Sequence, residues 1–370
     1  GARMALVALG EPAEPRLAAA AVETAPVRGT ITDRDGRLLA ANLPAWSVFA
    51  RPEEVDDPAG TARALAPILP GVDAATLERR LSAPRRFVWV RRPVTPRQRQ
   101  RIMDLDPARP ALKFGRRDMR VYPQGRAVAH IVGRVAAAEE GVRSAALVGK
   151  AGVELAFDAR LRDPARADRP LALSIDLGAQ QAMRDVLARG VARYGAKGAA
   201  GVMFDVRTGE VIAMVSLPDF DPNAPVDTTL RGADSPRFNQ AVTGLYELGS
   251  VFKALTAAIA IDVGVATPET ELDVLTPIRV RRNLFRERHD LPRYLSVTDI
   301  VARSSNLGSI RLALGVNTGR FREHMKALGL FEPTGLELGE AAARPLLPPE
   351  WTDLSTATIS YGHGLSVSPM

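Results

Sequence analysis

The sequence contains no cysteine, few aromatic residues and no long hydrophobic run. The absence of cysteine excludes thiol nucleophiles, CxxC redox pairs, structural disulfides and zinc sites built on cysteine. No window approaches the roughly 18 to 20 consecutive apolar residues that a membrane-spanning helix needs. His130, His289 and His324 show no metal-ligand spacing, and no nucleotide-binding or metal-binding motif occurs, so we expect neither a metal nor another cofactor.

The remaining composition is that of an ordinary globular protein. Of the 370 residues, 46% are hydrophobic and 25% are charged, which excludes a disordered or collagen-like chain. A chain of this length forms about two to three domains, and we take two as the working number.

Positive charge is concentrated in the first half of the chain. Residues 1–170 hold 29 Lys and Arg against 20 Asp and Glu, whereas residues 171–370 hold 20 against 22. The excess is densest over 79–126, where the aromatic residues available for base stacking are Phe87, Trp89, Phe114 and Tyr122. Because aromatic residues are few and no nucleic-acid motif occurs, we expect a solvated face rather than a nucleic-acid site. Contact with anionic lipid or a partner protein stays open.

The first half predicts a linker followed by a domain of short strands. Residues 11–27 mix Pro, Ala and Glu without apolar periodicity, which is typical of a linker. The Asp35-Gly36 pair between two strand-like runs predicts a hairpin. Helices are expected only near 58–69 and 73–82.

The second half predicts an α+β domain built on an antiparallel sheet. A strand is expected over 171–176, followed by a helix that Asp176 caps. The apolar face of that helix would hold Met183, Val186, Leu187 and Val191. Two apolar runs on either side of residues 207–209 then predict a hairpin with a glycine in its turn.

One segment carries the residue pattern of a serine nucleophile. Ser250 and Lys253 stand three residues apart at the start of an apolar helix, after Gly249 in a tight turn. A serine hydroxyl needs a base to take its proton, and a lysine can serve once desolvation lowers its pKa. Chance placement of 15 Ser and 5 Lys gives about 0.2 such pairs. The pair could otherwise be a helix cap beside a solvated lysine.

A second polar pair supports the nucleophile hypothesis. Ser304 and Asn306 precede another apolar run, where they could cap a helix. The hydroxyl could also relay protons, and the amide could hold a substrate. We interpret Tyr246, Glu247 and His363 as structural, with His363 ordering its loop through a hydrogen bond.

Together these segments resemble a known enzyme family. YELGSVFK and SSN resemble the first two signature motifs of serine penicillin-binding proteins and β-lactamases. The context is similar to class B penicillin-binding proteins, in the same order: RGTITDRDGRLLA, VYPQGRAVAHIVGRV, GVELAFDARL, LALSIDLGAQQ and GVMFDVRTGEVIAMVSLPDFDPN. The closing ATISYGHGLSVSP is most similar to the division-specific (FtsI-type) septal transpeptidases.

This resemblance implies a domain order and a set of catalytic roles. A linker over 1–27 would follow a membrane anchor, with a strand-rich pedestal over 28–170 and a penicillin-binding transpeptidase domain over 171–370. Ser250 would be acylated by a stem peptide ending in D-Ala-D-Ala, or by a β-lactam, after Lys253 takes its proton. Ser304 and Asn306 would complete the proton relay and orient the substrate. A second stem peptide's amine would then form the cross-link.

The resemblance also implies a location and partners. The expected place is the periplasmic face of the bacterial inner membrane at the division septum. The expected partners are a septal glycosyltransferase and other division proteins, besides stem peptides and β-lactams.

The sequence departs from the family pattern in two places. The Lys-Thr/Ser-Gly motif is absent, because Phe, Ala, Gly, Ala and Ala follow the five lysines. The anchor helix is absent as well. We interpret both as truncation, which would remove a substrate anchor and an oxyanion-hole donor and could leave this chain inactive. A binding scaffold or β-lactam sensor, and an elongation-type transpeptidase, stay as alternatives.

Overall fold

The computed structural model describes residues 28–69, 71–105, 111–137, 147–224, 229–339 and 343–370. The predicted linker over 1–27 lies outside the described residues. Contacts divide the described chain into two compact units. Unit 1 comprises described residues of 44–118, and unit 2 comprises those of 28–43, 119–137 and 147–370. The predicted domain boundary at residue 170 stays a prediction.

Unit 1 places helices against a small antiparallel sheet. Its central strand, β2 (Leu38–Ala50), pairs with β3 and with β4, and both β2 and β4 continue into unit 2. The core contains Val48, Leu65, Leu77, Val90 and Ile102, contributed by the strands and by the helices. The other elements are β3 (Val88–Val94), β4 (Leu112–Val121), η1 (Pro52–Glu54), α2 (Pro58–Leu65), α3 (Ala74–Leu81) and α4 (Pro96–Leu105).

The helices of unit 1 follow their capping residues. Asp57 accepts a hydrogen bond from the backbone N–H of Gly60 at the start of α2, and Asp73 caps α3 in the same way. Both helices that the sequence predicts are therefore confirmed. Helix α4 was not expected, because Ile102 is its one buried residue among those described and its apolar periodicity is weak.

The first strands of unit 2 surround the expected hairpin. Strand β1 (Ile31–Thr32) pairs antiparallel with the start of β2 and parallel with β7 (Leu171–Ala172). Gly36 has φ +84° in the connecting turn, a conformation that glycine adopts without strain. A second antiparallel pair and several short helices follow: η2 (Gly125–Val128), α5 (Ala129–Val132), β5 (Arg134–Ala137), β6 (Leu147–Ala151), α6 (Gly152–Ala156), α7 (Asp158–Leu161) and η3 (Pro164–Arg166).

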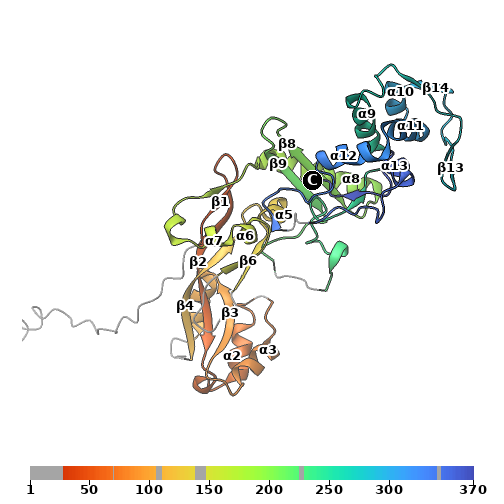
Figure 1. The fold of residues 1–370 in the computed structure, drawn as a ribbon. Coiled ribbons are helices and arrows are strands. Elements are labelled where there is room, and N and C mark those ends of the chain that lie inside the picture. Colours follow the sequence, from red (N-terminus) through yellow and green to blue (C-terminus); the bar gives the residue numbers. More distant parts are fainter. Residues whose placement is uncertain (1–27, 70, 106–110, 138–146, 225–228, 340–342) are drawn as a thin grey trace, which may run out of the picture. The chain divides into compact units, whose positions relative to one another are not determined.

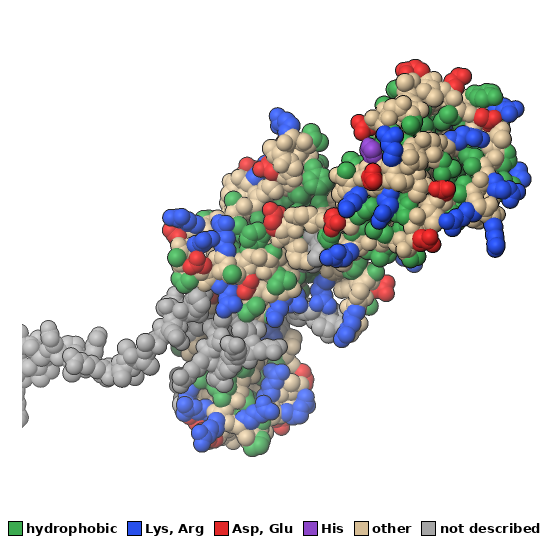
Figure 2. Space-filling model, viewed as in Figure 1, with side chains coloured by type: hydrophobic (Ala, Val, Ile, Leu, Met, Phe, Trp, Pro, Cys, Tyr) green, Lys and Arg blue, Asp and Glu red, His purple; other side chains and the backbone are tan. Residues whose placement is uncertain are grey.

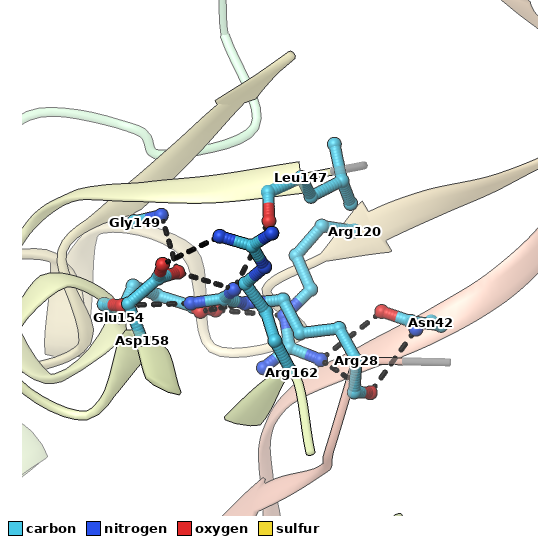
Figure 3. A network of polar contacts seen from close by, with 8 residues as sticks. All are labelled: Arg28, Asn42, Arg120, Leu147, Gly149, Glu154, Asp158 and Arg162. Carbon is cyan, nitrogen blue, oxygen red and sulfur yellow. Dashed lines mark hydrogen bonds and ion pairs between the residues drawn. The ribbon is translucent and has the colours of Figure 1, made fainter. Parts of the chain in front are cut away.

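A buried ionic cluster joins these early segments of unit 2 (Figure 3). Glu154 is fully buried and accepts hydrogen bonds from the Nε atoms of Arg28 at 2.5 Å and Arg120 at 2.7 Å. Arg28 also contacts Asp158 at 2.6 Å, and Arg120 donates to the Asn42 side chain. Residues separated by up to 130 positions are thereby held together, which a pattern search along the sequence cannot detect.

Helix α8 (Leu177–Tyr194) packs on the hairpin of β8 (Ala199–Phe204) and β9 (Val211–Leu217). Asp176 caps the helix by accepting from Ala179 N–H, as predicted, and the hairpin turn lies around Gly209 as expected. Val186 was placed on the apolar face but is exposed, because that face is narrower than the periodicity suggested. Of the strand predicted over 171–176, only Leu171–Ala172 forms a strand (β7), because the chain then turns and Asp176 caps α8.

The remainder of unit 2 is mainly helical. Helices α9 (Phe252–Asp262), α10 (Val297–Ala302) and α11 (Asn306–Val316) lie together, beside β13 and β14 (Figure 1). Phe252, Ile300, Ala313 and Phe321 share their core. The other elements are η4 (Gly232–Asp234), β10 (Tyr246–Glu247), η5 (Gly249–Val251), β11 (Glu271–Asp273), β12 (Ile278–Val280), β13 (Asn283–Phe285), β14 (Tyr294–Ser296), α12 (Thr318–Ala327), α13 (Asp353–Ile359) and β15 (Ser366–Val367).

Both units combine helices with mostly antiparallel strands, so the α+β prediction is confirmed. Among the helices that the structure describes, none combines the length and the apolar character needed to cross a membrane.

Candidate active site

The predicted nucleophile lies in the turn that leads into α9. Gly249 has φ +57°, which lets the chain turn from β10 into the short 3-10 helix η5. Ser250 lies in η5 and is exposed, whereas Phe252 and Lys253 are buried in the first turn of α9. The backbone thus presents the Ser250 residue to solvent at the positive end of a helix.

A second loop fixes this turn from the side of β15. The Gly249 N–H donates to the Gly362 carbonyl at 3.1 Å, and a Cβ atom at Gly362 would overlap the Gly249 backbone. The Glu247 carboxylate accepts from the Gly364 N–H at 2.7 Å and lies 3.1 Å from Nδ1 of His363. The Gly364 bond, followed by that of His363, lowers the pKa of Glu247. Glu247 and His363 therefore order the loop beside Ser250.

Lys253 is a buried amine that donates hydrogen bonds to two neutral oxygens. The residue is 2% exposed, and its Nζ donates to the Ser304 carbonyl oxygen at 2.5 Å and to Ser304 Oγ at 2.8 Å. Burial lowers the pKa of Lys253, and the charge of Glu287 partly opposes that effect. No ion pair shorter than 4 Å involves Lys253 within the described part of the chain. The site therefore favours the neutral, basic form of this amine more than water does.

The backbone at Ser304 is held in an unusual conformation. Its φ is +62°, in the left-handed region where a residue with a side chain costs about 1 to 3 kcal/mol. This conformation turns both oxygens of Ser304 toward Lys253. The next residue, Ser305, caps α11 by accepting from the Gly308 N–H, and Asn306 opens that helix.

Glu287 is a site residue that the sequence analysis did not identify. Its side chain is 2% exposed, and Oε2 accepts from Ser305 Oγ at 2.7 Å and from the Leu307 N–H at 3.2 Å. Burial raises the pKa of Glu287, but these hydrogen bonds and those from its own loop outweigh burial and leave it lowered. Glu287 lies 18 residues before Ser305 in a charged loop, and no motif in the sequence distinguished it.

The structure thus brings together some of the predicted residues directly. Lys253 and Ser304 are joined by hydrogen bonds, and Asn306 follows Ser304 at the start of α11. Ser250 lies one short turn before Lys253, but among the described residues no hydrogen bond joins Ser250 Oγ to Lys253 Nζ. The roles of these four residues stay predictions.

The hydrogen bonds of Lys253 leave it able to accept a proton. A neutral amine has two N–H groups and one lone pair, and two N–H groups suffice for the two Ser304 oxygens. The lone pair then remains for the proton of a neighbouring hydroxyl. Ser304 Oγ, which accepts from Lys253, keeps its own O–H to donate elsewhere. The arrangement can therefore remove a proton at one place and deliver one at another.

No group of three or more His, Asp and Glu side chains could hold a metal ion among the described residues. His289 contacts Glu287 at 3.1 Å, and His324 lies 3.7 Å from Asp262. A cavity of about 920 Å³ lies in unit 2 between β7, the β8–β9 hairpin and residues 328–338, and none of the four predicted site residues lines it.

The basic stretch of unit 1 presents Lys and Arg side chains on the face that Figure 2 shows. The candidate stacking residues Phe87 and Trp89 contact each other, with ring centroids 4.7 Å apart, and Arg92 covers the Trp89 ring at 4.4 Å. Tyr122 lies in unit 2 and is buried, which raises its pKa. The rings of Phe87, Trp89 and Tyr122 therefore make contacts within the protein.

Two protein-family models match the chain. The Penicillin-binding Protein dimerisation domain matches residues 23–165, and the Penicillin binding protein transpeptidase domain matches residues 199–370. The second match contains Ser250, Lys253, Ser304 and Asn306.

Curated proteins similar to this chain carry transpeptidase names. The probable peptidoglycan D,D-transpeptidase FtsI of Caulobacter vibrioides is 35% identical over 344 residues, which cover 93% of this chain and 56% of the relative. The peptidoglycan D,D-transpeptidase FtsI of Escherichia coli K12 is 31% identical over 368 residues, covering 93% and 60%. A probable peptidoglycan D,D-transpeptidase PenA of Neisseria meningitidis is 28% identical, covering 92% and 61%. The chain thus spans a little over half the length of these relatives.

Proposed function

Because the chain belongs to the class B penicillin-binding proteins of the FtsI type, we propose that it carries the acyl-serine site of a peptidoglycan D,D-transpeptidase. The observation that carries the proposal is the environment of Lys253. A buried amine with a lowered pKa, bonded to both oxygens of Ser304, suits a general base beside a serine nucleophile.

The first half of the reaction forms the acyl-enzyme. Lys253 takes the proton of Ser250 as Oγ bonds to the carbonyl carbon of the penultimate D-Ala, or to that of a β-lactam ring. The C–N bond then breaks, and its electron pair goes to the leaving nitrogen. Ser304 passes a proton to that nitrogen, and Lys253 replaces the proton of Ser304. The positive end of the η5–α9 segment favours the negative charge that develops on the carbonyl oxygen.

The second half transfers the acyl group to an amine. The amine of a second stem peptide attacks the Ser250 ester, and its proton returns to Ser250 through the same groups. Asn306 orients the peptide amide from the first turn of α11. The product is a cross-link between two stem peptides, and Ser250 is free again.

The same family membership supports our proposal for the cellular setting. We place the reaction at the periplasmic face of the bacterial inner membrane, at the division septum, with β-lactams as inhibitors. A septal glycosyltransferase and other division proteins would be the protein partners.

Acylation by a fluorescent penicillin tests the proposal. The chain is incubated with the reagent, and intact mass and peptide mapping locate the adduct. We expect it on Ser250 and expect none in Ser250→Ala, while circular dichroism shows an unchanged fold. An adduct that survives Ser250→Ala would show that another residue is the nucleophile.

A version extended by a segment with the Lys-Thr-Gly motif is tested in parallel. An adduct on Ser250 in that version alone would support the proposed function and show that acylation needs the third motif. If neither version is labelled, the result contradicts the proposed function and favours the binding scaffold.

A further inference from the structure

Glu287 occupies an unusual place beside the Ser304–Asn306 segment. It belongs to the loop between β13 and β14, and its carboxylate is buried rather than solvated. Burying an unpaired carboxylate is costly, so its hydrogen bonds must compensate. Oε2 receives the Ser305 hydroxyl and the Leu307 N–H, the latter from the first turn of α11.

These two bonds act on residues next to those of the predicted relay. Ser305 lies between Ser304 and Asn306 and bonds through its hydroxyl, and Leu307 follows Asn306 and bonds through its backbone N–H, so Glu287 holds the middle of the segment and its C-terminal side. The segment contains the left-handed residue Ser304, whose strain must be balanced by surrounding contacts. Glu287 supplies contacts of this kind from a separate part of the chain.

Glu287 also acts on Lys253 without pairing with it. Its charge opposes the effect of burial on the pKa of Lys253, yet no ion pair within 4 Å joins the two side chains among the described residues. A direct ion pair would hold Lys253 as an ammonium ion and remove the base. A carboxylate at greater distance adjusts the proton affinity of the amine and leaves its lone pair available.

We propose that Glu287 is a positioning residue for the acylation step: it holds Ser304–Asn306 against Lys253 and places a buried negative charge near that amine without pairing with it. The inference rests on the proposed function, because it assigns Glu287 a part in that reaction. Glu287 itself contacts no reacting atom.

Other charged groups face Glu287 and the neighbouring loop. Oε1 of Glu287 contacts Nδ1 of His289 at 3.1 Å and accepts from the Arg288 backbone N–H at 2.9 Å. Glu247 and His363 flank the Ser250 turn from the other loop. Because the His289 ring contacts the Glu287 carboxylate directly, the pH measurements are repeated in a His289→Gln background.

The first test reads the proton affinity of Lys253 directly. The chain has five lysines, so NMR of the 13Cε nuclei resolves few signals, and Lys253→Arg assigns the relevant one. In Glu287→Gln the amide oxygen still accepts from Ser305 and Leu307, but the charge is gone. We expect the titration midpoint of Lys253 to move to lower pH. Asp273→Asn, which removes a carboxylate bonded to Thr276 and Arg293 instead, should leave it unchanged.

The second test measures the acylation reaction. The acylation rate with a fluorescent penicillin is measured against pH, and its acidic limb reports deprotonation of the base. Glu287→Gln should shift this limb to lower pH at a nearly unchanged plateau. Glu287→Ala should also lower the plateau on the order of a hundredfold, because the relay is displaced. Glu287→Asp keeps the charge but shortens the side chain, so the limb should stay while the plateau falls.

The outcomes separate the inference from the proposed function. An unmoved Lys253 midpoint in Glu287→Gln would overturn the inference, whether or not the chain is acylated. Equal plateaus in all three variants would overturn the holding role. If Glu287→Ala does not fold, the Gln and Asp variants decide both points. If neither the wild-type chain nor its extended version gave an adduct on Ser250, but the NMR shift occurred, the proposed function would be refuted and the coupling of Glu287 to Lys253 retained.

Discussion

Unit 2 contains two buried polar clusters that differ in their partners: one joins opposite charges directly, and the other surrounds a lysine with neutral oxygens. In the first, the Glu154 carboxylate receives one guanidinium on each oxygen, from Arg28 and Arg120. In the second, Lys253 bonds to the neutral oxygens of Ser304, and the nearby carboxylate of Glu287 is occupied by other donors. Burial alone therefore does not distinguish a structural cluster from a reactive one.

The difference lies in what the partners do to proton affinity. Arginine stays protonated, so the Arg28–Glu154–Arg120 cluster keeps fixed charges that satisfy one another. Lysine gives up its proton more readily when it is buried without a direct counter-ion, and burial lowers the pKa of Lys253. The first cluster is suited to joining chain segments, and the second to moving a proton.

Removing the shared carboxylate should produce the largest effect on folding. Glu154→Ala leaves the buried guanidinium of Arg120 without its counter-ion and that of Arg28 with Asp158 alone, and breaking such a cluster costs about 3 to 5 kcal/mol of unfolding free energy. Urea denaturation measures the loss. Glu210→Ala is the matched control, because Glu210 pairs with Arg34 at the surface and should cost about 0 to 1 kcal/mol. Equal losses in the two variants would refute the structural role of the buried cluster.

The corresponding change in the second cluster should affect chemistry instead. Lys253→Met keeps the volume and removes the base, so acylation should slow by about 10² to 10⁴. Stability should be unchanged or higher, because an apolar side chain replaces a buried amine. The rate comes from labelling with a fluorescent penicillin, and the stability from the same urea series. A loss of stability as large as that of Glu154→Ala would make Lys253 a structural residue.

The two clusters also differ in how far the sequence predicted them. Ser250, Lys253, Ser304 and Asn306 were identified because two short motifs carry them, and local rules predicted the turn at Gly249. The suggested caps were wrong, because Ser305 caps α11 rather than Ser304 or Asn306. Glu287 and Glu154 were not identified, because their contacts join positions 18 to 126 residues apart. The hairpins at Gly36 and Gly209 and the cap at Asp176 depend on neighbours in sequence and were predicted correctly. Helix α4 was not, since its interior is almost entirely polar.

The smallest effect concerns the pH dependence of stability. The pKa of Lys253 in the folded protein lies below its ordinary value of 10.5, because burial lowers it more than Glu287 raises it. Below the folded pKa both states are protonated, and the cost of the buried charge is fully present. Between the two values the unfolded chain binds more protons, so stability rises with pH, by at most about 1.4 kcal/mol per unit.

This dependence should disappear in Lys253→Met. The difference in unfolding free energy between wild type and this variant should therefore move in favour of the wild type as pH approaches 10.5, and level off above it. Lys326→Met removes an exposed lysine from α12, so its difference from wild type should stay flat over the same range. Because all three proteins contain the same tyrosines, the contribution of these residues cancels. A flat difference for Lys253→Met would mean that its amine meets the same environment folded and unfolded, and the contrast between the two clusters would then fail.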